Sequence, residues 1–457
     1  MNVVELKPSD VLFFRDGRPM SGSLSGHGSA WPMPNVINNA FHAALWRAGM
    51  DDVHVHRTGK SGQYEEGNSR SERFGSLRTA GPFPIVDENW LFPRPMDLVS
   101  DTLAPDLLPV MISNLSSLAG PLQYPVANRR APSKESKAKA WMSQSAFQRY
   151  LDGSESGISE FDTYDDGDLF DTESQIGIAI DPDSQTTGFG EKKGDIYSAQ
   201  YLRIREINNK RQPIDVKIGT LADAWDKDQK CDLVDRLLSG SPTRILVGGQ
   251  QRICNATRRS SVGSIPLPTC RIDRFNCVSR DGKPRHLVKW ILLSPAVFPE
   301  VNVREGRSGQ PQPGGWLPNW VCSNSGAVLL KNGDTERDPM EPRVEWRSRV
   351  QSLPRIGANL VAAVVPKPLV VTGWALANPD AGRQEGAKPT HLAVPAGAVY
   401  YFEADTPEDA VALAAALNWH GSDPNCNTIR NRRSTLLGEK GFGIGVCGTW
   451  EFYSGPK

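Results

Sequence analysis

The sequence has no long hydrophobic run: none of its apolar stretches approaches the ~18 residues that a membrane-spanning helix needs. Its first five residues also lack the basic-then-apolar build of a secretory signal peptide. The formal net charge is zero, because 52 lysines and arginines balance 52 acids. Whole-chain charge therefore gives no support to nucleic-acid binding, which would need a local basic groove.

Paired cysteine motifs are missing as well. The seven cysteines, scattered from Cys231 to Cys447, are odd in number and suit a reducing cytosol better than a disulfide framework. Neither they nor the neighbours His54 and His56 have the spacing of a zinc site, and ordinary packing explains them better. We expect a cytoplasmic protein without membrane contact that holds no metal and no cofactor.

Most standard catalytic motifs are absent too. No G-x-S-x-G elbow occurs. Gly443 to Gly448 fits the dinucleotide pattern G-x-G-x-x-G, but only nine residues follow it, too few for the βαβ unit that the pattern must open. His27 is the serious catalytic candidate, because a histidine near neutral pKa can serve as base or acid in metal-free RNA cleavage. A loop histidine flanked by glycines is, however, commonly non-catalytic.

The 457 residues suffice for two or three domains. Four apolar residues at 11–14 predict a short buried strand, and Asp16-Gly17 then turns the chain. The turn carries Arg15 and Arg18, whose guanidinium forks suit phosphate oxygens. The alternative is a surface turn in which one of these arginines pairs with Asp16.

Further along the first half, the pattern predicts a helix over 34–49 and another from Thr220 to Gly240. Strands are expected at 173–181, 195–203 and 243–247, which gives residues 1–262 the order β-α-β-β-α-β, as in ferredoxin-like folds. The first two of these strands would form a hairpin around a long loop that contains Thr186, Thr187, Lys192 and Lys193. After the third come Gly248, Gly249, Gln250 and Arg252, where glycines let a backbone approach a ligand and the arginine adds charge.

The second half ends in a Gly-rich stretch. Its bare amides could line a phosphate, and nearby cations would add charge; the residues concerned are Arg432, Lys440, Gly441, Gly443 and Gly445. The alternative is a Gly-rich turn between two strands. Residues 152–173 carry nine acids and no lysine or arginine, which predicts a solvated face that would repel RNA.

Several of these motifs together resemble one family, the third subunit of the Cmr complexes, which are type III-B CRISPR effectors. The resemblance lies in residues 11–19, in the strand IYSAQYLR at 196–203, in the Gly-Gly-x-x-Arg of 248–252, in Gly-Trp-Leu-Pro at 315–318 and in the Gly-rich C-terminal loop. It implies an α+β fold of two ferredoxin-like (RRM-like, RAMP) domains, residues 1–262 and 263–457, with large loop and hairpin insertions. One insertion, near 181–197, is similar to the RAMP thumb.

The resemblance also implies a function. The chain would be a non-catalytic RNA-binding subunit that holds the five-prime tag of the guide RNA. Its partners would be the large polymerase-like subunit, the next backbone RAMP subunit and, indirectly, the target RNA. The candidate RNA-binding residues are Arg15, Arg18, His27, Thr186, Thr187, Lys192, Lys193, Gly248, Gly249, Gln250, Arg252, Arg432, Lys440, Gly441, Gly443 and Gly445. Two alternatives remain open: a RAMP-type ribonuclease that processes guide RNA, and a protein scaffold that barely touches RNA.

Overall fold

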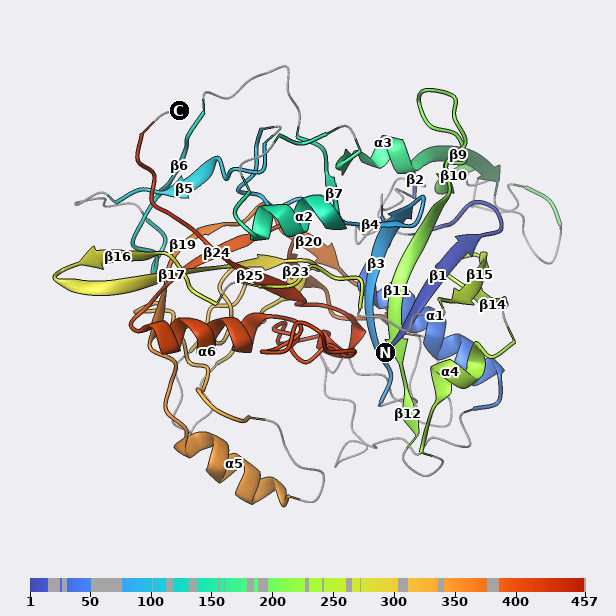
Figure 1. The fold of residues 1–457 in the computed structure, drawn as a ribbon. Helices are drawn as coiled ribbons and strands as arrows, with labels where there is room; N and C mark the ends of the chain where they lie inside the picture. Colours follow the sequence, from blue (N-terminus) through green and yellow to red (C-terminus); the bar gives the residue numbers. More distant parts are fainter. Residues whose placement is uncertain are drawn as a thin grey trace.

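The computed structural model describes residues 1–14, 25–26, 31–50, 76–100, 102–111, 118–130, 138–154, 157–159, 161–178, 185–187, 196–226, 230–240, 242–259, 265–271, 273–302, 311–335, 341–375 and 386–455. The fold is mixed α+β and is built on antiparallel sheets (Figure 1). Among the described residues, no helix has both the length and the apolar content to cross a membrane.

The larger sheet has eight strands in the order β14-β15-β1-β11-β3-β4-β7-β8. The strands are β1 (Asn2–Pro8), β3 (Arg78–Val86), β4 (Asn89–Pro93), β7 (Trp141–Ser143), β8 (Thr163–Tyr164), β11 (Val216–Asp223), β14 (Thr243–Leu246) and β15 (Ile253–Arg258). Helices α1 (Pro34–Arg47) and α4 (Leu233–Leu237) share an apolar core with one face of this sheet. The chain order β1-α1-β3-β11-α4-β15 is β-α-β-β-α-β, but the elements differ from those expected. The strands predicted at 173–181 and 195–203 are β9 (Phe170–Ile178) and β10 (Ile196–Ile204) in a separate sheet, and β3 and β11 take their places.

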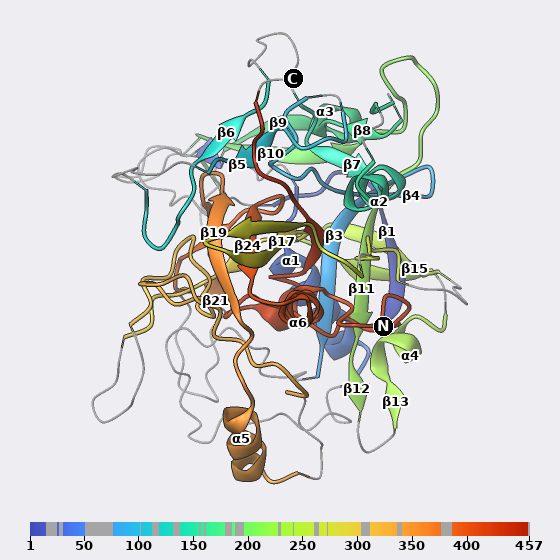
Figure 2. The same cartoon turned by 60° about the vertical axis from the view of Figure 1, so that its left-hand side comes forward.

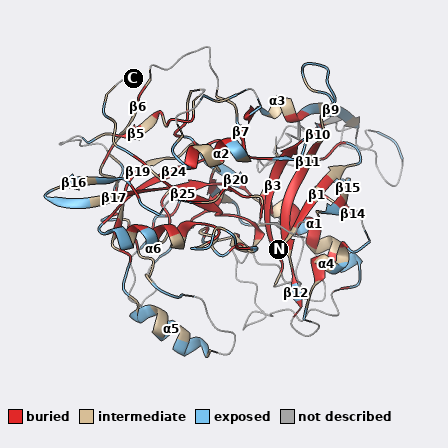
Figure 3. Cartoon of the chain, in the orientation of Figure 1, coloured by how far each residue is buried: buried red, intermediate tan, exposed pale blue. Residues whose placement is uncertain are grey.

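The second sheet comes from the C-terminal half. It runs β16-β17-β24-β19, and β25 also pairs with β17. Its strands are β16 (Cys277–Arg280), β17 (Lys283–Leu292), β19 (Ala358–Val364), β24 (Val399–Ala404) and β25 (Gly445–Thr449). Helix α6 (Pro407–Leu417) packs on β17, β24 and β25, and the Thr406 side chain caps it by accepting from the Asp409 amide. Helix α5 (Arg343–Ser352) has no buried residue and stands away from the sheet (Figure 3).

The remaining elements, most of them short apart from β9 and β10, lie outside the two large sheets. They are β2 (Ser25–Gly26), β5 (Leu107–Pro109), β6 (Val126–Asn128), β9 (Phe170–Ile178), β10 (Ile196–Ile204), β12 (Trp225–Asp226), β13 (Cys231–Asp232), β18 (Ala296–Val297), β20 (Leu369–Val371), β21 (Trp374–Ala375), β22 (Gly386–Ala387), β23 (His391–Val394), α2 (Gln144–Leu151), α3 (Asp166–Leu169) and the 3₁₀ turn η3 (Gly438–Lys440).

The two large sheets share one hydrophobic core. Phe83 and Trp90 from the first sheet belong to the same buried cluster as Trp290 and Tyr400 from the second. A buried ion pair also joins the two halves: Lys289 Nζ on β17 lies 2.9 Å from Asp97 Oδ2, which follows β4. Because such a core and ion pair cross between the halves, the halves pack as parts of one body rather than as beads on a linker.

Two predictions about local structure were wrong. The helix expected from Thr220 is strand β11, and only residues 233–237 form a helix there. β11 is almost continuously buried because both of its faces are covered, so its apolar run lacks the alternation that marks a half-exposed strand. Residues 11–14 are buried or half-buried as expected, but they make one bridge, between Leu12 and Leu202, rather than a strand.

The acidic segment is largely solvated as expected, with Asp152, Asp165 and Asp171 exposed, but part of its charge is paired. Bases from other segments pair with several of its acids: Asp162 with Arg149, Asp168 with Lys139, Asp171 with Arg205 and Glu173 with Arg203, at 2.7–3.2 Å. The guanidinium of Arg149 and the hydroxyl and amide of Ser159 hold the pKa of Asp162 below its usual range, against the effect of burial. Much of the negative charge is therefore neutralised within the fold.

Candidate functional site

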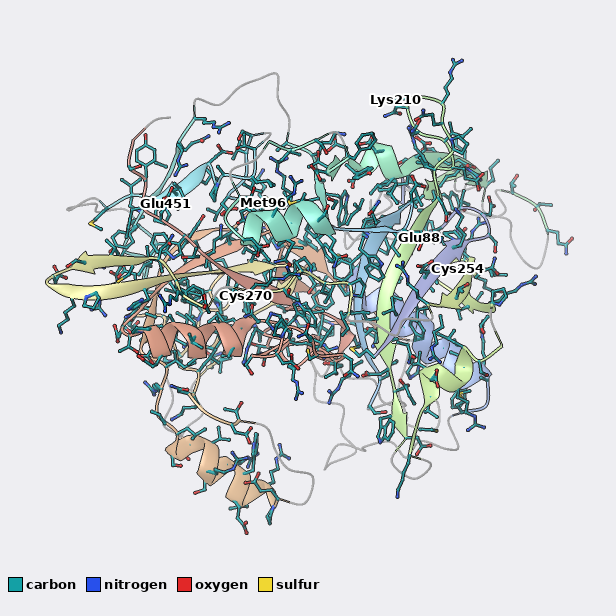
Figure 4. All side chains as sticks on the ribbon, in the orientation of Figure 1. Glu88, Met96, Lys210, Cys254, Cys270 and Glu451 are labelled. Atoms are coloured by element: carbon teal, nitrogen blue, oxygen red, sulfur yellow. The ribbon has the colours of Figure 1, made fainter. Side chains whose placement is uncertain are left out.

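The hairpin predicted from the sequence is present, formed by β9 and β10. The two strands pair antiparallel from Ile178 with Ile196 to Phe170 with Ile204. They lie at the upper end of the molecule, and β2 (Ser25–Gly26) runs parallel to β10 there (Figure 1). Lys210, in the connection that follows β10, points outward at the same end (Figure 4).

At the base of the hairpin, an aromatic and a cation are brought together. The Tyr201 ring on β10 lies 5.4 Å from the Phe13 ring, and the Arg252 guanidinium carbon lies 4.8 Å from the Tyr201 ring centroid. The Tyr201 hydroxyl donates to Gln250 Oε1 at 2.6 Å. Three candidate segments of the sequence, at 11–14, 196–203 and 248–252, thus meet at one place.

Arg252 is only loosely neutralised. Its Nη1 lies 3.7 Å from Asp10 Oδ2, its Nη2 donates weakly to Gln250 at 3.5 Å, and its buried Nε has no hydrogen-bond partner within the described part of the chain. About a quarter of the side chain, 26%, stays exposed. The guanidinium is therefore oriented by stacking on Tyr201 and keeps hydrogen-bonding capacity for an anion.

The two glycines of this turn have a packing role that the sequence did not indicate. Gly248 has a φ of +80°, and a Cβ there would meet the Phe13 carbonyl and the Phe14 ring. The Gly249 amide donates to the Phe13 carbonyl at 2.9 Å. Glycine is required at 248 because the turn packs against residues 13–14, so the expected approach of a ligand is not needed to explain it.

The other residues expected in this region are only partly described. Thr186 and Thr187 are exposed within the hairpin connection. Arg15, Arg18, His27, Lys192 and Lys193 lie outside the described residues. Their role in RNA binding stays a prediction.

The Gly-rich loop packs beside the start of α1. Met33, the N-cap residue of α1, contacts the small cluster that contains Leu437 and Phe442. Gly441 has a φ of +95° and faces the backbone of Thr79 on β3, where a Cβ would lie 3.0 Å from the Thr79 carbonyl. No side chain caps α1 and no acid lies in its first turn; Pro34 has no amide hydrogen and the Val36 amide donates to the Met33 carbonyl, so it is the helix dipole that would attract an anion there.

The expectation that this loop offers bare amides was wrong for residues 440–444. The amides of Lys440, Gly441 and Phe442 donate to carbonyls of residues 437 and 438, that of Gly443 donates to the Pro295 carbonyl, and that of Ile444 donates to Ser294 Oγ. A Cβ at Gly443 would overlap the Ser434 backbone, and one at Gly445 would overlap the Trp290 ring. These two glycines are needed for packing, as in the alternative of a Gly-rich turn.

Lys440 and Arg432 are nonetheless unusual cations. Burial lowers the pKa of Lys440 to about 8, with repulsion from Lys388 adding to the shift, and its ammonium has no hydrogen-bond partner among the described residues. Burial likewise lowers the pKa of Arg432 to about 10 against the attraction of Asp223, and among the described residues its guanidinium is bonded to the Ile429 carbonyl and the Met1 sulfur. Positive charge held without a carboxylate contact, near an uncapped helix start, favours an anionic ligand.

Comparison with known families identifies the chain. A family model described as CRISPR-associated protein (Cas_Cmr3) matches residues 4–450. The chain belongs to this family. The resemblance noted in the sequence, to the third subunit of the type III-B Cmr complexes, is thereby confirmed.

Solved structures similar to this Cas_Cmr3 chain include one in a cryo-EM structure of the type III-B Cmr-beta bound to cognate target RNA. The identity is 12%, the alignment covers 87% of this chain and 86% of that chain, and the TM-score is 0.36. A chain in the crystal structure of a Csm1-Csm4 cassette in complex with AMPPNP is also 12% identical, over 66% of this chain and 82% of that chain, with a TM-score of 0.25. No curated protein matches.

Sequence reasoning missed two members of the Cas_Cmr3 candidate site. Tyr201 was read only as part of the strand IYSAQYLR; its buried ring orients Arg252, a contact that depends on the fold. Lys388 was not singled out in the sequence. Its proximity to Lys440 depends on the fold, because η3 and the start of β23 are about 50 residues apart in the chain.

Proposed function

We propose that this Cas_Cmr3 chain is the non-catalytic subunit of a cytoplasmic type III-B effector that binds the five-prime tag of the guide RNA. In that role it bridges the large polymerase-like subunit and the neighbouring backbone RAMP subunit. The observation that carries the proposal is the partly exposed, loosely paired guanidinium of Arg252 at the base of the hairpin. The buried Tyr201 ring orients this guanidinium, whose planar fork fits a phosphate.

The two-domain assignment belongs to the same proposal. In the first half, β1-α1-β3 and β11-α4-β15 are two βαβ units. The sheet order β15-β1-β11-β3 pairs the last strand of each unit with the first strand of the other unit. The second half repeats the order as β25-β17-β24-β19. This repetition supports two ferredoxin-like RAMP domains, residues 1–262 and 263–457. The second domain departs from the first in one respect: of its two described helices, α6 packs on its sheet and α5 does not.

The positive groups near the Gly-rich loop supply a second contact in this proposal. Lys440, Lys388 and the uncapped start of α1 would hold a backbone phosphate of the guide. Binding of an anion beside Lys440 would raise its pKa from about 8, so guide binding would be accompanied by proton uptake near that pH.

The proposal is tested by the salt dependence of guide binding, measured on the assembled complex. Arg252→Ala should reduce the slope of log affinity against log salt by about 0.7 for a lost single-strand phosphate contact. Arg244→Ala is a matched control, because Arg244 is an exposed arginine on the adjacent strand β14. Arg15→Ala and Arg18→Ala should act as Arg252→Ala does. An unaltered slope in all three, with the complex intact, would assign them to the scaffold.

A further inference from the structure

Helix α5 is stable without a share in the hydrophobic core. None of its residues is buried, and Val344 is 77% exposed. Figures 1 and 2 both show α5 at the lower end of the molecule, away from the sheets, while the hairpin of β9 and β10 lies at the upper end. A ten-residue helix is marginal in water on its own, so something other than burial holds it.

Polar contacts with Lys331, Asp334 and Glu341, on the segments that precede α5, hold the helix. Lys331 Nζ donates to the carbonyls of Gln351 and Leu353 at the C-terminal end of α5. A positive charge there also interacts favourably with the negative end of the helix dipole. Arg349 forms a two-point ion pair with Glu341 and donates to the Asp334 carbonyl at 2.6 Å. These contacts fix the helix in place, and they leave the side of α5 that carries Arg343, Val344 and Arg347 exposed.

The side chains on the outer side of α5 are suited to an anion. Arg343 and Arg347 are both exposed, and neither has a hydrogen bond or an ion pair within the described part of the chain. They are one helical turn apart, about 6 Å along the axis, so both can reach neighbouring phosphates of one strand. Ser348 and Gln351 are exposed next to them and add hydrogen-bond donors.

A protein groove is a poorer match for the same surface. A helix that docks in a groove presents apolar anchors at i, i+3 or i+4, and i+7. Counting from Val344, these positions hold Arg347, Ser348 and Gln351, all polar and exposed. Charge complementarity thus favours the backbone of a nucleic acid over an apolar groove.

We propose that α5 is a docking arm for the target RNA, whose phosphates bind Arg343 and Arg347. The inference rests on the proposed function, because it is the guide-loaded effector that brings a target strand to this subunit. The guide's tag is assigned to the opposite end of the molecule. An arm open on its outer side fits a strand that arrives after assembly.

The test uses the assembled, guide-loaded complex and a complementary single-stranded RNA. Arg343→Gln with Arg347→Gln should lower the salt slope of target binding by about 1.4 units, at ~0.7 per single-strand phosphate. The advantage of the wild type over the variant should then shrink about 7-fold between about 50 and about 200 mM salt. Glutamine is nearly as good a helix former as arginine, so the fold should persist. Arg271→Gln with Arg274→Gln, two exposed arginines outside α5, is the control of equal charge loss.

Each outcome decides the matter. An unchanged slope, a loss of guide from the purified complex, or loss of a protein subunit would each overturn the proposal, the last in favour of a protein partner. A photocrosslinker attached at Val344→Cys should label the target RNA, and labelling of the guide or of a protein would refute it. If Arg252→Ala leaves guide binding unaltered while α5 still affects target binding, the proposed tag site fails and the α5 site stands.

Discussion

The buried ion pair between the two halves allows a sharp test of how this fold is held together. Lys289 and Asp97 are 3% and 0% exposed, and Tyr150 donates to both carboxylate oxygens of Asp97 at 2.7 and 2.8 Å. Lys289 Nζ also contacts the Tyr150 hydroxyl at 2.6 Å. Asp97→Asn keeps the shape but leaves the ammonium without a counter-charge, which should lower the free energy of unfolding by about 3–5 kcal/mol.

The companion variants separate the ion pair from simple packing. Asp97→Asn with Lys289→Met removes both charges and should be more stable than Asp97→Asn alone, since replacing a buried pair by neutral groups is often nearly neutral. The half-exposed pair of Lys139 and Asp168 is the control, and Lys139→Met should cost about 1 kcal/mol or less. Urea unfolding, followed by both near- and far-ultraviolet circular dichroism, measures these differences.

The sign of the pH dependence gives a second readout. Burial lowers the pKa of Lys289, and the charge of Asp97 opposes this shift. A lysine with a lower pKa in the folded state loses its proton on folding at alkaline pH, so its contribution to stability rises with pH up to its unfolded pKa, ~10.4. The loss of unfolding free energy that Asp97→Asn causes should therefore become smaller as pH rises toward that value. The reasoning would be refuted if Asp97→Asn lowered the free energy of unfolding by less than about 1 kcal/mol. It would also be refuted if the double variant lost as much as Asp97→Asn and Lys289→Met lose separately, added together.

Two further predictions concern the Gly-rich loop. Gly443→Ala should abolish folding or lower the melting temperature sharply, because φ at this residue is +73° and the added Cβ would overlap Ser434. The control Gly49→Ala, at a φ of +66° with open space around it, should be much milder. Equal melting curves for the two variants would contradict this reasoning. Because burial lowers the pKa of Lys440 to about 8, the free energy of unfolding of the wild type should rise between pH 8 and about 10.5. Lys440→Met should remove that rise and increase the free energy of unfolding at pH 7 by about 3 kcal/mol. A variant with the same pH profile as the wild type would contradict the assignment.

Patterns with a clear period were read well from the sequence. Helix α1 begins at a proline and stops near Gly49, and the hairpin of β9 and β10 is within a few residues of its expected place. Local signals sufficed here, because caps, glycine stops and alternation are encoded within one segment. The same holds for the strand that precedes Gly248.

What failed depended on neighbours distant in the chain. β11 looked helical because sheets and helices cover both of its faces, a fact absent from residues 216–223 themselves. The glycines at 443 and 445 looked like a ligand loop, but they are required by Ser434 and by Trp290. The charge of the acidic segment was overestimated because its partners, such as Arg205, come from other strands.

The central position of β1 in the first sheet has a consequence for synthesis. Val4 pairs with Thr220 on one side and with Arg258 on the other. At ~5–20 residues per second, the roughly 250 residues up to the later partner take a ribosome about 12 to 50 s. The first strand has neither neighbour until β11 emerges and lacks the second until β15 emerges, so this part of the sheet closes late. We therefore expect the nascent chain to depend on chaperone protection of residues 2–8 until β15 emerges.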